Sequence, residues 1–186
     1  MKSAWDEFFD ELARWSDIGR SVDFWWRDDD ATRRTVPLDR LVALACSARV
    51  PLALAVIPLD AQADLLSGDQ GFVTVLQHGV AHRNAAGPAE KKTEFPAGGS
   101  VGAAAQGLQS GQRKLTDLFG TRSLRVLVPP WNRISDPRLV AGLADSGFVG
   151  LSRFGPRAAA GLDEADDGGT ARAQKRPASR CGHPFG

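Results

Sequence analysis

The chain has few cysteines and no long apolar run, and both absences narrow what the protein can be. Cys46 and Cys181 form no CxxC pattern, and Cys46 lies in an apolar helical segment, LVALACSA, where we expect a buried, reduced thiol. No apolar stretch approaches the roughly 20 residues that cross a bilayer. The N-terminus, MKSAWDEFFDELARW, is acidic and lacks the continuous apolar segment of a secretory signal. We therefore expect a cytoplasmic protein.

An excess of charge of either sign is also absent. The 186 residues include 23 Lys and Arg against 22 Asp and Glu, which gives a net charge of +1. That balance provides no general attraction to nucleic acid or to an anionic membrane, so neither is expected as a partner. The length and the ordinary hydrophobic fraction of 42% suit one domain with a real core.

Predicted strands alternate with predicted helices along most of the chain. Strand-like runs cover residues 22–27, 51–58, 72–76, 124–128 and 148–151, and helical patterns cover residues 3–16, a segment opened by Pro37, and residues 60–66, 104–119 and 136–146. This alternation predicts an α/β fold with parallel strands. On the first helix, large apolar side chains recur at helical spacing, which favours a face packed on the core.

The character of the sequence changes from about residue 157. The last segment is rich in Gly, Ala and charged residues and has almost no hydrophobic periodicity. We therefore expect an α/β domain over residues 1–156 and a low-order tail over residues 157–186. No core strand is expected after about residue 160.

Polar residues follow three of the predicted strands. The acids Asp28, Asp29 and Asp30 follow the first strand, His78 and His82 follow the third in an HxxxH pattern, and the sequence PPWN follows the fourth. The carboxyl ends of parallel strands meet at one edge, where sites form. We therefore expect these three segments to build one site.

One carboxylate and two imidazoles are suitable ligands for Zn²⁺ or a similar divalent metal. Three protein ligands leave a position open for the water that hydrolyses an amide or ester, and a second acid can take its proton. Each pattern alone has a simpler interpretation: two surface histidines, an acidic turn or helix N-cap, and a rigid proline loop. Their joint occurrence at strand ends favours a site.

These motifs resemble a divergent branch of the polysaccharide deacetylase, or NodB-homology, superfamily. The resemblance covers roughly residues 20–155 and implies an irregular (β/α)-barrel. The first family motif reads T-F-D-D-G, and the corresponding segment here is WRDDDATRRTVP. With Pro37 aligned to the family proline, the resemblance implies that Asp29 is the catalytic base and Asp30 a metal ligand. A register shifted by one, with Asp28 and Asp29 in those roles, stays open.

The second family motif, H-(S/T)-x-x-H, corresponds to HGVAH. The resemblance implies that His78 and His82 complete the metal site, with Gly79 in place of the hydroxyl residue. Downstream, Glu94 lies in the segment AEKKTEFP, for which a polar loop is the ordinary interpretation.

The third family motif, R-x-P-(Y/F/W), corresponds to LVPPWNR. Pro130 and Trp131 match it and are expected to line the substrate groove, with Trp131 as a stacking platform for a sugar ring. Val128 occupies the arginine position, and Arg133 is the nearby substitute.

The later family motifs, which include a histidine that acts as general acid, have no recognisable counterpart. The remaining histidine, His183, lies in the predicted tail. The chain also ends before a complete barrel of this family would close. We therefore expect a C-terminally incomplete barrel with weak or absent hydrolysis.

The leading hypothesis is a metal-dependent hydrolase that removes an N- or O-linked acetyl group from a carbohydrate. Zn²⁺ is the expected metal, and an acetylated carbohydrate or related small molecule is the expected partner. Two alternatives stay open. One is a non-catalytic metal- or sugar-binding remnant that lacks the general acid, and the other is a fragment whose barrel is too incomplete to fold stably.

Overall fold

The computed structural model describes residues 2–21, 24–66, 71–153 and 163–166. Its strands are β1 (Trp26–Ala31), β2 (Leu52–Val56), β3 (Val73–His78), β4 (Ser123–Val128), β5 (Gly150–Arg153) and β6 (Asp163–Asp166). Its α-helices are α1 (Ala4–Asp17), α2 (Val36–Ala48), α3 (Val101–Phe119) and α4 (Pro137–Ala141). Three short 3-10 helices are η1 (Ala63–Leu65), η2 (Gly120–Arg122) and η3 (Pro130–Asn132). Strands and helices alternate from β1 to β5, as the sequence predicted.

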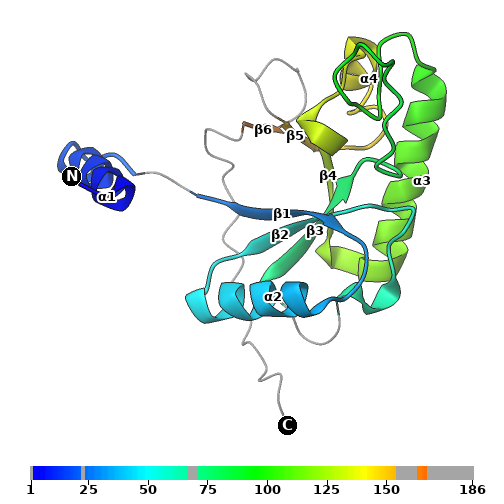
Figure 1. Cartoon of the computed structure of the whole chain (residues 1–186). Coiled ribbons are helices and arrows are strands. Elements are labelled where there is room, and N and C mark those ends of the chain that lie inside the picture. The colour runs from blue at the N-terminus through cyan, green and yellow to red at the C-terminus, as the bar shows by residue number, and fades with distance from the viewer. Residues whose placement is uncertain (1, 22–23, 67–70, 154–162, 167–186) are drawn as a thin grey trace.

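The six strands form one parallel sheet in the order β1-β2-β3-β4-β5-β6. Each strand therefore lies beside its neighbours in the chain, as in a (β/α)-barrel. The sheet is curled. Its curl brings Arg27 on β1 within hydrogen-bonding distance of Ser152 on β5, with Nη1 2.6 Å from Oγ. Within the described residues β1 and β6 do not pair, so the sheet is an open part of a barrel (Figure 1).

The centre of the sheet is buried on both faces, and the two faces differ in side-chain size. In β2, Leu52, Leu54 and Val56 pack with helical side chains on the outer face. Ala53 and Ala55 belong to a separate cluster with side chains of β3 and β4 on the inner face. Burial on both faces explains why β2 is apolar throughout. The predicted buried strand within residues 51–58 is confirmed.

Two helices cover the outer face of the sheet. α2 begins after Thr35, whose hydroxyl accepts a hydrogen bond from Leu38 N–H, and ends at Arg49 in a left-handed conformation. α3 begins after Ser100, whose hydroxyl accepts from Ala103 N–H. The side chains that these helices bury in the outer core are Leu38, Ala45, Leu115 and Phe119.

α1 lies apart from the sheet (Figure 1). Its start is fixed by a capping box, in which Ser3 and Asp6 each accept a hydrogen bond from the other's backbone N–H. The predicted helix is confirmed, but its predicted packing on the core is wrong, because no residue of α1 is buried. Trp5 is 69% exposed. Its ring packs on those of Phe8 and Phe9, at centroid distances of 6.1 and 6.2 Å.

The first strand begins later than predicted. We expected it over residues 22–27, whereas β1 runs from Trp26 to Ala31 and includes Asp28, Asp29 and Asp30. The acids therefore lie within the strand and not after it. Asp is depleted in strands, so the local pattern could not extend the strand through three of them.

Other boundaries also differ from the prediction. The helical segments expected over residues 60–66 and 136–146 are shorter, as η1 and α4. β6 pairs with β5 beyond residue 160, where no core strand was expected. The rest of the predicted tail, with His183, lies outside the described residues.

The state of Cys46 also differs from the prediction. Cys46 is partly buried in α2 and is disulfide-bonded, so the prediction of a reduced thiol is wrong. Among the described residues, no helix combines the length and the apolar character needed to span a membrane.

Candidate metal centre

A bulge in β1 redirects Asp30. The strand pairs Asp28 with Leu54 and next pairs Ala31 with Val56, so β1 advances three residues while β2 advances two. Asp30 adopts a left-handed conformation with φ of 65°, which Asp tolerates better than most residues. Regular alternation would place Asp30 on the same face as Asp28. The bulge turns it toward the end of β3 instead.

The two histidines come from the end of β3 and from the loop that follows. His78 is the last residue of β3 and is buried. The chain then turns through Gly79, with φ of 62°, and reaches His82, with φ of 53°. These two left-handed residues bring the His82 ring centroid to 5.0 Å from that of His78.

Asp30, His78 and His82 meet at one point. Asp30 Oδ1 lies 3.1 Å from His78 Nε2 and 3.2 Å from His82 Nε2, and the three ligand atoms all lie within 4.8 Å of one another. Donor atoms about 2.1 Å from a tetrahedral Zn²⁺ lie about 3.4 Å apart. One carboxylate oxygen and two imidazole nitrogens at these separations therefore fit a divalent metal. The geometry favours the register in which Asp30 is the ligand.

The backbone of β4 orients His78. Its Nδ1 lies 2.9 Å from the carbonyl oxygen of Val128, so a proton on Nδ1 donates to that carbonyl and leaves the Nε2 lone pair for a metal. Burial lowers the pKa of His78, with a smaller opposing effect from the hydrogen bond to Val128. The lowered pKa keeps the imidazole neutral, and the neutral form is the one that binds a metal.

Glu94 holds the loop between the two histidines. Its carboxylate accepts hydrogen bonds from Val80 N–H at 3.0 Å and from Ala81 N–H at 2.7 Å. The carboxylate also fills the space beside Gly79, where an added Cβ would lie 2.1 Å from Glu94 Oε2. The positive φ of Gly79 and this close approach both exclude a larger residue. Glu94 is thus a positioning residue that the sequence left without a role.

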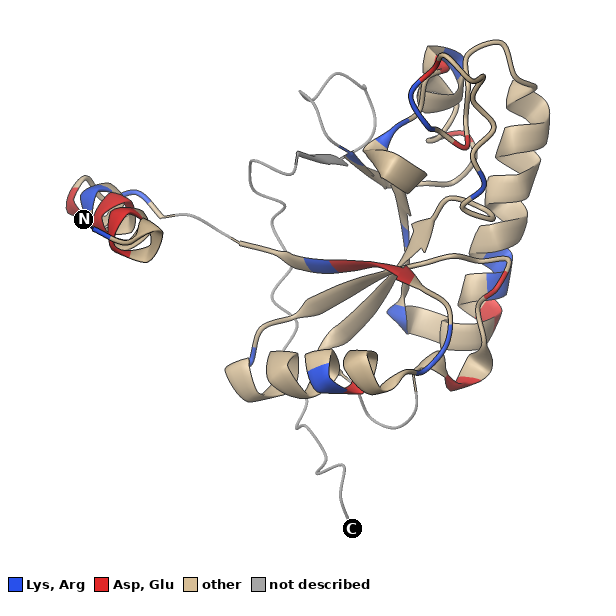
Figure 2. Cartoon of the chain, in the orientation of Figure 1, with Lys and Arg blue, Asp and Glu red and all other residues tan. Residues whose placement is uncertain are grey.

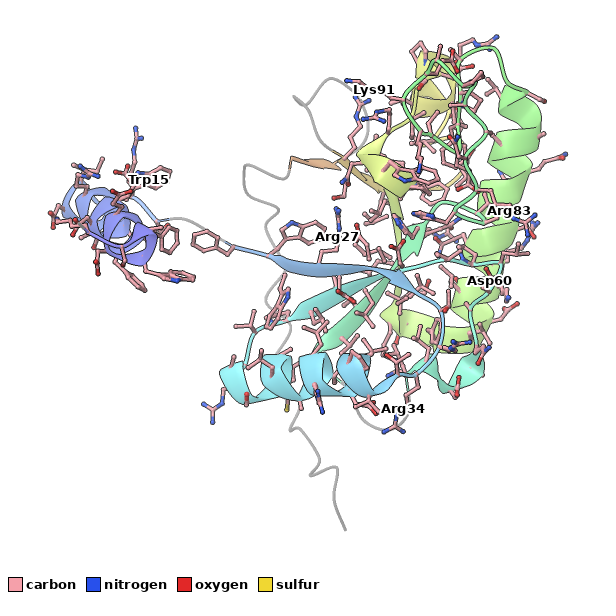
Figure 3. The ribbon with its side chains drawn as sticks, in the orientation of Figure 1. Trp15, Arg27, Arg34, Asp60, Arg83 and Lys91 are labelled. Carbon is pink, nitrogen blue, oxygen red and sulfur yellow. The ribbon has the colours of Figure 1, made fainter. Side chains whose placement is uncertain are left out.

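Asp29 is paired with Arg27 of the same strand. Arg27 Nε and Nη2 lie 2.8 and 3.1 Å from the two carboxylate oxygens of Asp29, which makes a bidentate ion pair. Arg27, whose side chain is labelled beside β1 in Figure 3, also donates to Ser152 Oγ at 2.6 Å and to Asn132 Oδ1 at 3.0 Å. The guanidinium therefore connects β1, β5 and the loop after β4 while it fixes the Asp29 carboxylate. The sequence predicted no role for Arg27, because the motif resemblance points to an arginine beside PPWN.

The loop after β4 places Trp131 against the metal-binding residues. Pro130 is buried, and Trp131 and Asn132 both have left-handed backbones, with φ of 56° and 53°. The Trp131 ring centroid lies 4.5 Å from that of His82. Arg133 turns elsewhere: its Nη1 donates to a carbonyl oxygen in the loop after β3, at 2.9 Å. The guanidinium of Arg133 is therefore held by the loop after β3, and Arg27 is the arginine that pairs with Asp29.

Backbone strain gathers at this centre. Of five non-glycine residues with positive φ in the described ranges, one, Arg49, ends α2. The other four are Asp30, His82, Trp131 and Asn132. Each such residue costs about 1–3 kcal/mol, and residues of this kind concentrate at functional sites because the surrounding structure holds them in place.

Two hollows with opposite charge flank the centre. The larger, of about 1040 Å³, includes Asp28, Asp29, Asp30 and Asp60 in its wall. Burial, followed by the charges of Asp29 and Asp30, raises the pKa of Asp28. In Figure 2 a blue band on β1 is followed by a red stretch, as expected from the sequence of Arg27 and the three acids after it. The smaller hollow, of about 390 Å³, is lined by Trp131, Asn132, Arg133, Ile134 and Arg153.

Comparisons with known proteins bear on the fold. No protein-family model matches the chain, and no curated protein matches it. Among solved structures, the chain is similar to the Streptococcus pyogenes deacetylase PplD in complex with acetate, with a TM-score of 0.53 and 12% sequence identity. The match covers 89% of this chain and 74% of that one. The chain therefore has a deacetylase-like α/β fold, in agreement with the curled parallel sheet.

Proposed function

We propose that this protein is a metal-dependent hydrolase that removes an N- or O-linked acetyl group from a carbohydrate. The observation that carries the proposal is the convergence of Asp30, His78 and His82. The adjacent residue of β1, Asp29, has its carboxylate held by Arg27. These three ligands suit a divalent metal, and Zn²⁺ is favoured by two neutral imidazoles and one carboxylate. The likeness in fold to a deacetylase supports acetyl as the group removed.

In this proposal the metal, Asp29 and Arg27 have separate roles in catalysis. When bound, the metal supplies Lewis acidity, which lowers the pKa of a water and polarises the acetyl carbonyl. Asp29 accepts the proton of the attacking water. Arg27 uses one lone pair on each Asp29 oxygen, and the second lone pair of each oxygen remains for the water.

The loop after β4 provides the substrate groove in this proposal. Pro130 and Trp131 form the wall next to His82, and Arg133 lies two residues further along the same loop. An aromatic ring held rigidly at the edge of a site is a suitable platform for the apolar face of a sugar ring. A carbohydrate is therefore favoured as the carrier of the acetyl group.

Acetate release tests the proposal. The full chain, stripped of metal with a chelator and reloaded with Zn²⁺, is incubated with N-acetylated and O-acetylated oligosaccharides. Release should require the metal and should be lost in Asp29→Asn, since a carboxamide cannot take the proton. Asp29→Asn should still bind the metal, whereas Asp30→Asn should bind it more weakly. A metal-loaded protein that releases no acetate from any of these sugars would contradict hydrolysis.

A second candidate function is binding of a metal or sugar without catalysis. Both histidines of the described ranges belong to the metal-binding group, so neither is free to act as general acid. A general acid contributes roughly 10²- to 10⁴-fold to such a reaction. Under this alternative, calorimetric titration with Zn²⁺ shows binding that His78→Ala and His82→Ala each weaken, while no acetate is released.

A further inference from the structure

We infer that the smaller hollow, beside the metal centre, binds an anionic group of the substrate, either a carboxylate or a phosphate ester. The inference rests on the proposed function and narrows its substrate class to acidic acetylated saccharides. The hollow has a volume of about 390 Å³, within the range of small-molecule sites. It lies at the carboxyl ends of β4 and β5, the edge of the sheet that also carries the metal-binding residues.

The hollow shares its walls with the reaction centre. Trp131 lines it and also contacts the ring of His82, with centroids 4.5 Å apart. Asn132 lines it as well and accepts a hydrogen bond from Arg27, the partner of Asp29, at 3.0 Å. A sugar whose acetyl group reaches the metal can therefore place a neighbouring substituent in this hollow.

The positive charge of Arg133 favours an anion in the hollow. Its described wall contains two arginines, Arg133 and Arg153, and no carboxylate. Within the described ranges Arg133 forms no salt bridge, and its guanidinium donates to the neutral carbonyl oxygen of Lys92 at 2.9 Å. A neutral sugar alone would leave the charge of Arg133 without a counter-charge in this wall. The hollow on the other side of the centre has four aspartates and one arginine, Arg33, in its wall, and this excess of negative charge would repel the same group.

Arg133 is held in position before any ligand arrives. Its carbonyl oxygen accepts a hydrogen bond from Thr93 Oγ1 at 2.9 Å, and its N–H donates to Pro130 O at 3.2 Å. The hydrogen bond to Lys92 fixes the guanidinium from the other end. A preorganised guanidinium loses little freedom on binding, and its planar fork matches carboxylate and phosphate oxygens.

Binding to metal-free protein tests the inference apart from catalysis. The full chain, kept in chelator, is titrated by calorimetry with glucuronate, glucose 6-phosphate and glucose. At least one of the two anionic sugars should bind about tenfold or more tightly than glucose, because hydrogen bonds to charged groups are worth more than neutral ones. A preference for glucuronate would identify carboxylated sugars as the source of the anion, and a preference for glucose 6-phosphate would identify phosphorylated sugars.

Matched variants locate the anion. Arg133→Gln should reduce the preference for the anionic sugar to near unity, and Arg133→Lys should restore part of it, since the charge returns without the fork. Arg113→Gln removes the same charge from an exposed position on α3 and should leave the preference unchanged. Equal binding of glucose and both anions, or an equal loss in Arg113→Gln, would overturn the inference. After removal of the chelator, Zn²⁺ titration of Arg133→Gln should match that of the unchanged protein, so failure here is separate from failure of the metal site.

Discussion

Gly79 and Glu94 show how single residues shape the candidate metal centre. The HGVAH segment turns at Gly79, and the Glu94 carboxylate occupies the volume that a side chain at position 79 would need. A Ser or Thr at this position, as in the motif that the segment resembles, would collide with that carboxylate. Glycine at position 79 is therefore required by the carboxylate of Glu94, which fills the adjacent space.

Removal of the Glu94 carboxylate should weaken metal binding without unfolding the protein. Glu94→Ala releases the N–H groups of Val80 and Ala81 between the two histidines. Residues that orient the metal ligands without touching the metal typically contribute about 10- to 100-fold to metal affinity. We therefore expect Zn²⁺ calorimetry to show a loss of affinity of that size. Glu94→Gln keeps an acceptor oxygen and should lose less. Glu90→Ala is the control, because Glu90 caps Gly87 N–H in the same loop, away from the histidines.

The lowered pKa of His78 predicts a pH dependence of stability. In metal-free folded protein, NMR titration should give His78 a midpoint below 6.5, and in urea the midpoint should return to its ordinary value. The unfolded chain then takes up a proton at higher pH than the folded chain. The unfolding free energy should therefore fall as the pH is lowered from neutrality through the ordinary pKa. A midpoint at or above 6.5 in the folded protein would contradict this.

At the scale of elements, the sequence predicted what depends on local periodicity. Residues 51–58 and 72–76 were recognised as buried strands, and the histidine pair was placed at the end of the third. The bulge at Asp30 was out of reach, because it follows from the pairing of β1 with β2 and not from the acidic run itself. Arg27 was missed for a similar reason: its partners at positions 132 and 152 come together only when the sheet curls.

The contact of α3 with β3 predicts opposite effects for two glycines of one helix. An added Cβ at Gly111 would lie 2.7 Å from Gln77 Nε2 and 2.9 Å from Pro58 Cγ. Gly111→Ala should therefore lower the unfolding free energy by about 1–3 kcal/mol through overpacking. Gly102 has open space around it, so Gly102→Ala should raise stability by up to about 1 kcal/mol. Urea unfolding of both variants measures the two signs, and equal effects would contradict the close contact.

At the scale of the whole molecule, one guanidinium spans the curl of the sheet. Four strand pairings separate β1 from β5 around the sheet, yet Arg27 bonds Ser152 directly across the interior. The side chain of Arg27 is only 11% exposed, and that of Asp29 is 32% exposed. The ion pair with Asp29 balances the charge of Arg27 inside the curled sheet. The curvature of the sheet and the orientation of the proposed base therefore depend on the same residue.

Two variants separate these dependences. Arg27→Met removes the charge and leaves the partly buried Asp29 carboxylate without this partner, so the unfolding free energy should fall by about 1–3 kcal/mol. Ser152→Ala breaks only the link to β5 and should cost about 0.5–1.5 kcal/mol. Both proteins should keep their Zn²⁺ affinity within a few-fold, because neither residue belongs to the metal-binding group of Asp30, His78 and His82. Acetate release should fall strongly in Arg27→Met and little in Ser152→Ala, since only the first frees the base. If both variants lost release equally, the curl rather than the ion pair would control Asp29.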